Sequence, residues 1–160
     1  MKRSQIKIEV PGLGALYLWH LVLDYNGTLA VDGALLPGVK SRLRTLGRAL
    51  ELHVLTADTF GRARRELQDV NCRLAVLGPK AQDRAKAAYV RRLGARRTVC
   101  IGNGRNDRLM LRAAALGIAV VQAEGAARES VMAADVIVAS VLDALDLLSE
   151  PLRVLATLRS

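Results

Sequence analysis

Three polar stretches follow apolar runs in a way that could support chemistry. Asp24 ends the apolar run of "LVLDYNGT", Thr56 ends "LHVLT", and the 102–107 loop, "GNGRND", closes the run "TVCIG". A carboxylate beside a tight turn whose backbone amides can point at an anion is suited to attack phosphorus, giving an acyl phosphate that water later cleaves. The sequence therefore favours phosphoryl transfer at Asp24, with residues 26–28 forming the turn.

Attack by one anion on another needs positive charge, which a divalent cation and a lysine can supply. Lys86 lies in a stretch with apolar residues at Val90 and Leu93, and this helical spacing places the stem of Lys86 near the sheet. Asp107 offers hard oxygen ligands suited to magnesium. Thr56 offers a hydroxyl group to a phosphate oxygen. We therefore expect Mg²⁺ as the cofactor.

The elements that must position these residues alternate along the chain. Helical spacing predicts helices at 38–51, 60–69, 81–94, 106–116, 126–134 and 141–148. Short apolar runs predict strands at 52–56, 72–77, 98–102, 117–121 and 135–139. This alternation predicts an α/β fold, with a three-layer, Rossmann-like parallel sheet and helices on both faces. Ligands of such sheets bind at the carboxyl ends of the strands, where Asp24, Thr56 and the 102–107 loop would lie.

The two ends of the chain are expected to extend this core. Residues 5–10 and 15–24 flank the turn signal "PGLG" and predict an N-terminal β-hairpin. A single domain is expected over 1–160, with its core at about 16–148. A terminal helix over 151–159 carries apolar residues at Leu152, Leu155 and Leu158. Two interpretations of this helix stay open, namely self-association into a homo-oligomer and packing on its own domain.

Composition fits a soluble globular protein, with 51% apolar and 24% charged residues. No apolar run reaches the about 18 residues of a membrane span. The N-terminus alternates polar and apolar residues, which is typical of a strand and not of a signal peptide. We expect a cytoplasmic protein without membrane contact.

Cys72 and Cys100 are interpreted as small buried residues in a reducing cytosol, in preference to a disulfide or a metal site.

The formal net charge of +9 raises the question of nucleic acid binding. Basic clusters at 61–66 and 91–97 could contact phosphates. However, only five aromatic residues exist, and none is interleaved with these clusters to stack on bases. The arginines also fall at polar positions of expected helices. We interpret them as solvated helix faces, and a nucleic acid partner is not expected.

Together, the Asp-x-x-Gly-Thr stretch at 24–28, the strand-ending Thr56, the helical Lys86 and "GNGRND" resemble the haloacid dehalogenase superfamily of phosphohydrolases. Residues 99–138 are similar to the phosphorylation domain of P-type ATPases and to its soluble capless relatives. The likeness covers roughly residues 16–148. It implies a phosphohydrolase, similar to a phosphatase or ATPase, that lacks a cap domain.

The resemblance also implies roles for individual residues. Asp24 matches the nucleophile, and Lys86 matches the lysine that steadies the phosphate, with Lys80 as a rival whose spacing fits the family less well. The residues implied in phosphate binding are Thr28, Thr56, Ala57, Lys86 and Asn106. The residues implied in magnesium binding are Asp24, Asn26 through its backbone carbonyl, Asn103 and Asp107.

Two residues depart from the family pattern. Asn26 stands where most family phosphatases have an acid that protonates the leaving group, and an amide cannot exchange a proton at neutral pH. General acid–base help contributes about 10²–10⁴-fold, so attenuated turnover with a preference for good leaving groups is expected. Asn103 replaces a metal-binding Asp and weakens magnesium binding. The alternative hypothesis is a catalytically silent phosphate-binding or regulatory module.

The gaps between the motifs bear on the substrate. Only 31 residues separate Asp24 from Thr56, which leaves room for a helix and a strand but not for an inserted cap. Residues 29–38 are long enough for a small flap, in which Asp32 is interpreted as a turn residue. An open site suits a small phosphorylated substrate, a phosphorylated macromolecule or closure by another subunit.

Three other polar residues receive less specific interpretations. His20 and His53 are interpreted as ordinary core or edge histidines and not as ligands. Asp58 either pairs with Lys86 or caps the following helix, and the sequence leaves both open.

Overall fold

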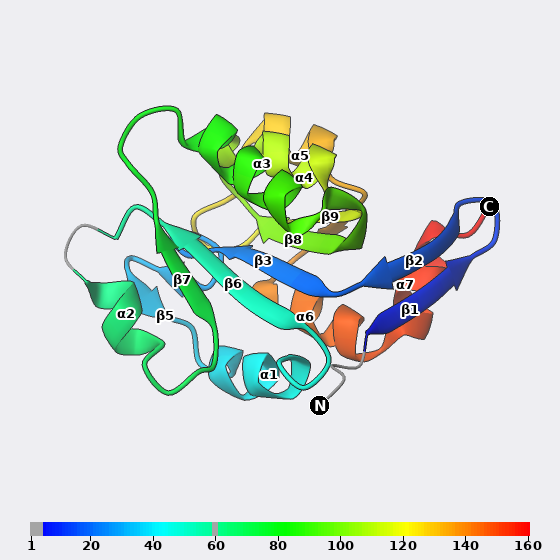
Figure 1. The fold of residues 1–160 in the computed structure, drawn as a ribbon, viewed down its shortest axis with the longest axis horizontal. Coiled ribbons are helices and arrows are strands. Elements are labelled where there is room, and N and C mark those ends of the chain that lie inside the picture. Colours follow the sequence, from blue (N-terminus) through cyan, green and yellow to red (C-terminus); the bar gives the residue numbers. More distant parts are fainter. Residues whose placement is uncertain (1–4, 59–60) are drawn as a thin grey trace.

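The computed structural model describes residues 5–58 and 61–160, and its centre is a six-stranded parallel sheet (Figure 1). The strands lie in the order β10-β9-β8-β3-β6-β7, and every neighbouring pair is parallel. Their bounds are β3 His20–Asp24, β6 Glu51–Thr56, β7 Arg73–Val76, β8 Thr98–Gly102, β9 Leu116–Val120 and β10 Val136–Val138. The expected parallel sheet is confirmed.

Helices cover both faces of this sheet, as expected (Figure 1). The upper face in the figure carries α3 (Gln82–Leu93), α4 (Arg108–Ala113) and α5 (Arg128–Ala133). The lower face carries α1 (Val39–Leu46) and α6 (Val141–Ser149), while α2 (Arg62–Glu66) lies beyond the β7 side. Successive strand residues point to opposite faces, so Val22 packs under α3 and α4 while Leu21 and Leu23 belong to the other, larger core.

The N-terminal hairpin is shorter than expected. β1 (Ile6–Val10) pairs antiparallel with β2 (Gly14–Leu18), and β3 then starts at His20 in the central sheet. The expectation of one strand over 15–24 is therefore wrong. The chain changes sheets at Trp19, whose N–H donates to the carbonyl oxygen of Arg97 and whose carbonyl oxygen accepts from the N–H of Glu51. The segments on both sides of Trp19 are extended and mostly apolar, so periodicity alone does not reveal the change.

The terminal helix, α7 (Pro151–Leu158), packs on its own chain. It lies along the hairpin (Figure 1), and Val154 is fully buried there. Leu155 and Leu158 pack against the same core, whereas Leu152 is 76% exposed. The packing interpretation holds for this helix, and self-association stays a prediction.

Most helices are shorter than their patterns predicted. The helix expected at 38–51 ends at Leu46, because the chain turns at Gly47 and enters β6 at Glu51. The helix expected at 60–69 is reduced to α2, and residue 60 lies outside the described residues. The helix expected at 106–116 begins as a 3-10 turn, η2 (Arg105–Asp107), and continues as α4. A second 3-10 turn, η1 (Ala95–Arg97), precedes β8.

A small hairpin lies within the segment 29–38, where a flap was expected. β4 (Ala30–Val31) pairs with β5 (Ala34–Leu35), and the two residues between them, Asp32 and Gly33, both have positive φ, at 51° and 79°. Two such residues are typical of the tight turns that join hairpin strands, which confirms the interpretation of Asp32. The described residues contain no cap domain.

The structure also bears on the expectations about membrane spans and cysteines. No helix in the described part of the chain is long and apolar enough to cross a membrane. Cys72 is half-buried and Cys100 is buried, and both are free thiols. Burial raises the pKa of both thiols, so neither is an activated nucleophile.

Candidate active site

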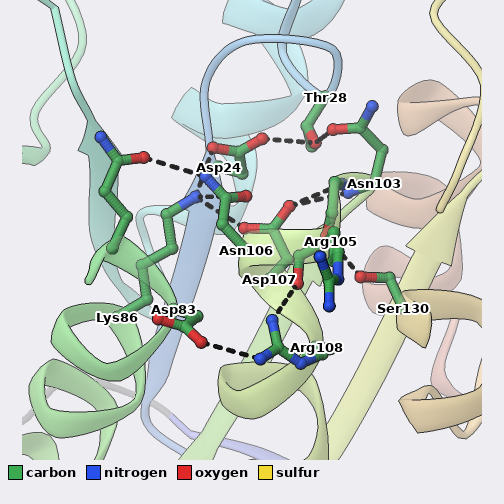
Figure 2. A network of polar contacts seen from close by, with 12 residues as sticks. Asp24, Thr28, Asp83, Lys86, Asn103, Arg105, Asn106, Asp107, Arg108 and Ser130 are labelled. Atoms are coloured by element: carbon green, nitrogen blue, oxygen red, sulfur yellow. Dashed lines mark hydrogen bonds and ion pairs between the residues drawn. The ribbon is translucent and has the colours of Figure 1, made fainter. Parts of the chain in front are cut away.

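Three strand ends meet at the carboxyl edge of the sheet, as the sequence predicted. β3 lies between β6 and β8, so Asp24 has Thr56 on one side and the 102–107 loop on the other. Asp24 is 7% exposed, Thr56 is 2% exposed and Asp107 is fully buried. Figure 2 shows the carboxylates of Asp24 and Asp107 turned toward the same ammonium group. These polar groups form the most deeply buried charged cluster of the described residues.

That ammonium group belongs to Lys86, which reaches the strand ends from α3. Its Nζ lies 2.8 Å from Asp24 Oδ1, 2.7 Å from Asp107 Oδ1 and 3.4 Å from Asn106 Oδ1. The Lys86 side chain is 2% exposed. Lys80, the rival, is exposed, so the structure brings Lys86 and not Lys80 to the cluster. Lys86 thus contacts the expected nucleophile as well as Asn106 and Asp107.

The cluster carries more negative than positive charge. Burial, and next the negative charge of Asp107, raise the pKa of Asp24 to about 7, although Lys86 and Thr28 oppose the shift. Burial lowers the pKa of Lys86, but the two carboxylates outweigh it and the pKa is raised overall. Lys86 therefore stays protonated, and one ammonium serves two buried carboxylates. The resulting deficit of positive charge is what a bound cation would offset.

The Thr28 hydroxyl lies between the second oxygen of Asp24 and the side-chain oxygen of Asn103. Thr28 Oγ1 lies 3.3 Å from Asp24 Oδ2 and 3.1 Å from Asn103 Oδ1. A hydroxyl has one proton, so it cannot donate to both oxygens at once. Gly27 lies beside Asn103 with φ at 79°, and a Cβ there would come within 2.4 Å of Asn103 Nδ2. Only glycine fits at this position, which explains the Gly in the turn.

The turn after Asp24 departs from the sequence prediction. Its amides were expected to point at an anion, but the N–H of Gly27 donates to Ala30 O at 2.8 Å and the N–H of Thr28 donates to Tyr25 O at 3.3 Å. The expectation is wrong for these two amides, because the turn closes on itself. Thr28 is also fully buried, and its hydroxyl contacts the Asp24 carboxylate from the protein interior.

Asp107 holds the 102–107 loop together. Its Oδ2 accepts the backbone N–H of Asn103 at 3.0 Å and that of Gly104 at 2.9 Å, while Oδ1 accepts from Lys86. Both carboxylate oxygens therefore already have donors. The loop is fixed further by Ser130, whose hydroxyl donates to the carbonyl oxygen of Gly104. This geometry favours Asp107 as the residue that orients the loop and the lysine.

Asn106 is oriented by a second amide. Its Nδ2 donates to Gln82 Oε1 at 2.9 Å, which fixes its Oδ1 toward Lys86. Figure 2 shows this side chain between the lysine and the loop. Gln82 lies at the start of α3, so this bond ties the 102–107 loop to the helix that carries Lys86.

Thr56 differs from all these groups. Its hydroxyl is buried and has no hydrogen-bond partner in the described part of the chain. A buried hydroxyl without a partner costs free energy, on the order of 1–3 kcal/mol, so it marks a place where a ligand atom is expected. Ala57, which was also expected to bind phosphate, is the first residue after β6.

The site opens toward solvent on the side of Asn26, which is exposed. A cleft here is lined by Tyr25, Asn26, Gly33, Ala57, Asp58, Arg62 and Arg65.

For Asp58 the sequence left two roles open, pairing with Lys86 and capping the following helix, and the structure shows the second. Its carboxylate accepts the N–H groups of Arg62 at 2.9 Å and Ala63 at 3.0 Å, so it caps α2 and does not pair with Lys86.

Sequence reasoning missed one residue that positions the nucleophile. Gln122 Nε2 donates to Gly27 O at 2.9 Å and Thr28 O at 2.6 Å, and Gln122 Oε1 accepts the N–H of Val141 at 2.9 Å. Gln122 thus ties the turn after Asp24 to the start of α6. A polar residue directly after the apolar run of β9 was the signal available in the sequence. Ser130 was missed as well, since it lies inside an ordinary helical pattern.

The oxygen donors at this site fit magnesium. Asp24 and Asn103 supply side-chain oxygens on either side of the Thr28 hydroxyl, and Mg²⁺ prefers such hard ligands. Two oxygens compete for the single proton of the Thr28 hydroxyl, and the buried charges leave a deficit of positive charge. Asn103 lowers the number of anionic ligands but keeps an oxygen in place.

Comparison with known protein sequences gives two archaeal relatives, both uncharacterized. Protein MJ0073 of Methanocaldococcus jannaschii is 44% identical over 64 residues, which covers 40% of this chain and 69% of that protein. Protein MJ0072 of the same organism is 49% identical over 39 residues, which covers 24% of this chain and 89% of that protein. No family model matches the chain.

Solved structures show what the fold resembles. The 3-deoxy-D-manno-octulosonate 8-phosphate phosphatase of Moraxella catarrhalis, in complex with magnesium, phosphate and KDO, has a TM-score of 0.70 at 15% identity, covering 87% of this chain and 90% of that chain. The cobalt-bound phosphatase of Haemophilus influenzae has a TM-score of 0.69 at 16% identity, covering 89% and 94%. The catalytic domain of the CPx-ATPase CopB-B has a TM-score of 0.55 at 22% identity, covering 73% and 45%. At these identities the likeness shows the fold, and it confirms the expected one.

Proposed function

Since this chain belongs to the family of the archaeal proteins MJ0073 and MJ0072 and has the haloacid dehalogenase fold, we propose that it is a magnesium-dependent phosphohydrolase. Asp24 is the nucleophile, and the reaction passes through a phosphoaspartate. The observation that carries this proposal is the buried, unpartnered hydroxyl of Thr56 beside a carboxylate that is held by a buried lysine.

In the first step, a carboxylate oxygen of Asp24 attacks phosphorus. A bond forms between this oxygen and phosphorus, and the bond from phosphorus to the leaving oxygen breaks. The leaving group departs as an anion and takes its proton from water. The hydroxyl of Thr56 donates to a phosphate oxygen, and the Lys86 ammonium offsets the charge of the approaching phosphate.

In the second step, water attacks the phosphorus of the phosphoaspartate. The bond between Asp24 and phosphorus breaks, which regenerates the carboxylate and releases inorganic phosphate and a proton. Asn26 stands on the open side of the site, where an acid could protonate the leaving group and later accept the proton of water. Its amide does neither, so both steps are slower than with an acid at this position.

Magnesium would be held by Asp24, the backbone carbonyl of Asn26 and Asn103. When bound, it supplies charge that offsets the repulsion between the nucleophile and the phosphate. Asp107 acts on this chemistry through the backbone amides and the lysine that it holds. A neutral ligand at Asn103 gives a weaker magnesium site than a carboxylate would.

The substrate class follows from the same geometry. A small phosphorylated molecule can enter the open cleft beside Asn26, and the fold is shared with phosphatases of a small sugar-acid phosphate. The missing acid favours acyl and aryl phosphates, since their leaving oxygens need no proton. Arg62 lines the same cleft and favours a substrate that is itself anionic.

The test is a hydrolysis screen with acetyl phosphate and p-nitrophenyl phosphate, with and without Mg²⁺. We expect magnesium-dependent hydrolysis that Asp24→Asn abolishes. The matched control is Asp32→Asn, which changes a carboxylate in the flap turn where an asparagine tolerates the positive φ. Acid quenching during turnover should also trap a protein-bound phosphate that hydroxylamine releases. Hydrolysis that survives Asp24→Asn overturns the proposal.

A second candidate function is a phosphate-binding module without turnover. Asn26 and Asn103, which remove an acid and a charged ligand, are the observations that favour it. The same experiment separates the two, because a silent module is stabilised against heat by phosphate with magnesium but yields neither product nor trapped phosphate.

A further inference from the structure

A second cluster of ionisable side chains lies at the opposite edge of the central sheet. His20 begins β3 and Glu51 begins β6, and the two are directly paired in the sheet register. His53 lies two residues further along β6, so its side chain is on the same face as that of Glu51. This is the face under α3, and the proposed nucleophile lies at the other end of β3. Asp24 lies four positions after His20 on this strand, which corresponds to about 13 Å.

The ligand atoms of the three side chains lie close together. His20 Nδ1 lies 3.2 Å from His53 Nε2 and 3.7 Å from Glu51 Oε2, and one ligand atom from each residue lies within 4.8 Å of the others. Two nitrogens bound to one tetrahedral Zn²⁺ at about 2.0–2.1 Å are about 3.3 Å apart. The observed nitrogen separation therefore already matches that of two zinc ligands, and the carboxylate oxygen lies 3.7 Å from His20 Nδ1.

The neighbours of the cluster orient two of these groups. Tyr89 Oη, on α3, lies 2.9 Å from His53 Nδ1. When that nitrogen donates its N–H to the tyrosine, the lone pair of Nε2 faces His20. Arg73 binds the other carboxylate oxygen of Glu51 at 2.6 Å, which turns Oε2 toward the histidines. Histidine ligands of metals usually have a hydrogen-bond partner of this kind on the second nitrogen.

Burial also fits a metal site. His53 is fully buried, whereas the side chains of His20 and Glu51 are 18% and 17% exposed. The cluster is therefore closed on the protein side and open to solvent on the other. This partial exposure gives an ion a route of entry.

We propose that His20, His53 and Glu51 form a binding site for a transition-metal ion of the Zn²⁺ class, independent of the magnesium chemistry at Asp24. Imidazole nitrogens select such ions over Mg²⁺, which prefers oxygen ligands. The ion joins the amino ends of β3 and β6, and its ligand His53 contacts Tyr89, three residues after Lys86 on α3. The site therefore stabilises the strands and the helix that position the proposed nucleophile and its lysine.

The test uses full-length, tag-free protein stripped with EDTA and then titrated with Zn²⁺ or Co²⁺ in millimolar Mg²⁺. Calorimetry and metal analysis after gel filtration give the stoichiometry, and the visible absorption of Co²⁺ reports nitrogen ligands and low coordination number. We expect one bound ion per chain in the wild type and in Asp24→Asn. Binding is lost in His20→Gln and in Glu51→Gln, both of which change partly exposed side chains.

A subtler variant tests the orienting contact. Tyr89→Phe keeps the ring and removes the hydroxyl, so it should weaken Zn²⁺ binding about 10- to 100-fold while circular dichroism stays unchanged. The proposal is overturned if the wild type retains no Zn²⁺, because the two imidazoles then share only an N–H···N hydrogen bond. It is also overturned if Zn²⁺ binding survives His20→Gln and disappears in Asp24→Asn. Neither result depends on phosphatase activity.

Discussion

Lys86 Nζ lies 2.8 Å from Asp24 Oδ1, although the two residues are 62 positions apart in the chain. The same nitrogen lies 2.7 Å from Asp107 Oδ1, so one buried cation serves two buried carboxylates. This arrangement neutralises only part of the negative charge at the carboxyl edge of the sheet. The two buried carboxylates therefore depend on Lys86 for their stabilisation, and a further cation would stabilise them more.

Replacing this lysine should destabilise the fold. Lys86→Met keeps most of the apolar stem but leaves Asp24 and Asp107 without their cation, at a cost of about 3–5 kcal/mol. Urea denaturation at pH 7 measures the loss. Lys80→Met, at an exposed position of the preceding loop, is the control and should change stability by less than about 0.5 kcal/mol. Equal effects of the two substitutions would show that the buried pair is not needed.

Metal-free protein should lose stability as the pH rises. The pKa of Asp24 is about 7 in the folded protein, since burial and the charge of Asp107 raise it from the ordinary 3.8. The folded state therefore binds this proton more tightly than the unfolded state, and the unfolding free energy falls between about pH 4 and pH 7. Asp24→Asn removes this contribution. In EDTA, the melting temperature of the variant relative to that of the wild type should increase as the pH is raised from 4.5 to 7.5. A difference in melting temperature between the two proteins that stays constant from pH 4.5 to 7.5 contradicts this.

The missing acid can be restored. Asn26→Asp places a group that protonates leaving oxygens on the open side of the site, so hydrolysis of an alkyl phosphate should rise by about 10²-fold. Hydrolysis of an aryl phosphate should rise much less, since a phenolate leaves without a proton. The ratio of the two kcat/KM values is the measurement, and Asn26→Ser is the control without an acid. An unchanged ratio would remove Asn26 from the explanation of substrate preference.

The charge of the metal site can be tested at Asn103. Its Nδ2 donates to Gly125 O at 3.0 Å, a bond that Asn103→Asp loses while it adds a third carboxylate. The variant should be less stable than the wild type in EDTA. It should also need about tenfold less Mg²⁺ for half-maximal activity, because an anionic ligand replaces a neutral one. Magnesium titrations of activity and of melting temperature measure both effects. A higher Mg²⁺ requirement would mean that Asn103 is not a ligand.

Gln122 should affect the rate more than substrate binding. Gln122→Glu keeps the shape of the side chain but turns the donor to Gly27 O and Thr28 O into a repelling oxygen. The turn then shifts, and a displacement of about 1 Å at a nucleophile costs up to about 10²-fold in kcat. We expect KM to change little. Gln68→Glu, an exposed residue in the loop after α2, is the control. A change in KM alone would make Gln122 a binding residue instead of a positioning residue.

Much of the fold was predictable from local sequence. Alternating apolar runs and helical patterns identified five of the six central strands, whereas β3 was placed inside a longer strand expected over 15–24. The strand-ending positions of Asp24 and Thr56 were correct. These features depend on side-chain periodicity within a few residues. Errors occurred where two structures share one local pattern. Trp19 joins strands of different sheets, and the first turn of the helix at Asp107 is a 3-10 turn.

Contacts between distant segments were not predictable in the same way. The sequence allowed Asp58 to reach Lys86, but the start of α2 takes both carboxylate oxygens. It could not show that Gln122 holds the turn after Asp24, nor that His20 and His53 face one another across two strands. These contacts depend on which strands are neighbours.

By itself, therefore, the sequence determined the kinds of groups available for phosphoryl chemistry and the α/β layers that carry them. Only the tertiary structure decided which groups meet. The order β8-β3-β6 brings the 102–107 loop and Thr56 to either side of Asp24, and α3 delivers Lys86 from above. The physical reason is that strand order and helix packing follow from burial of the whole core, whereas periodicity reports only the local face of each element.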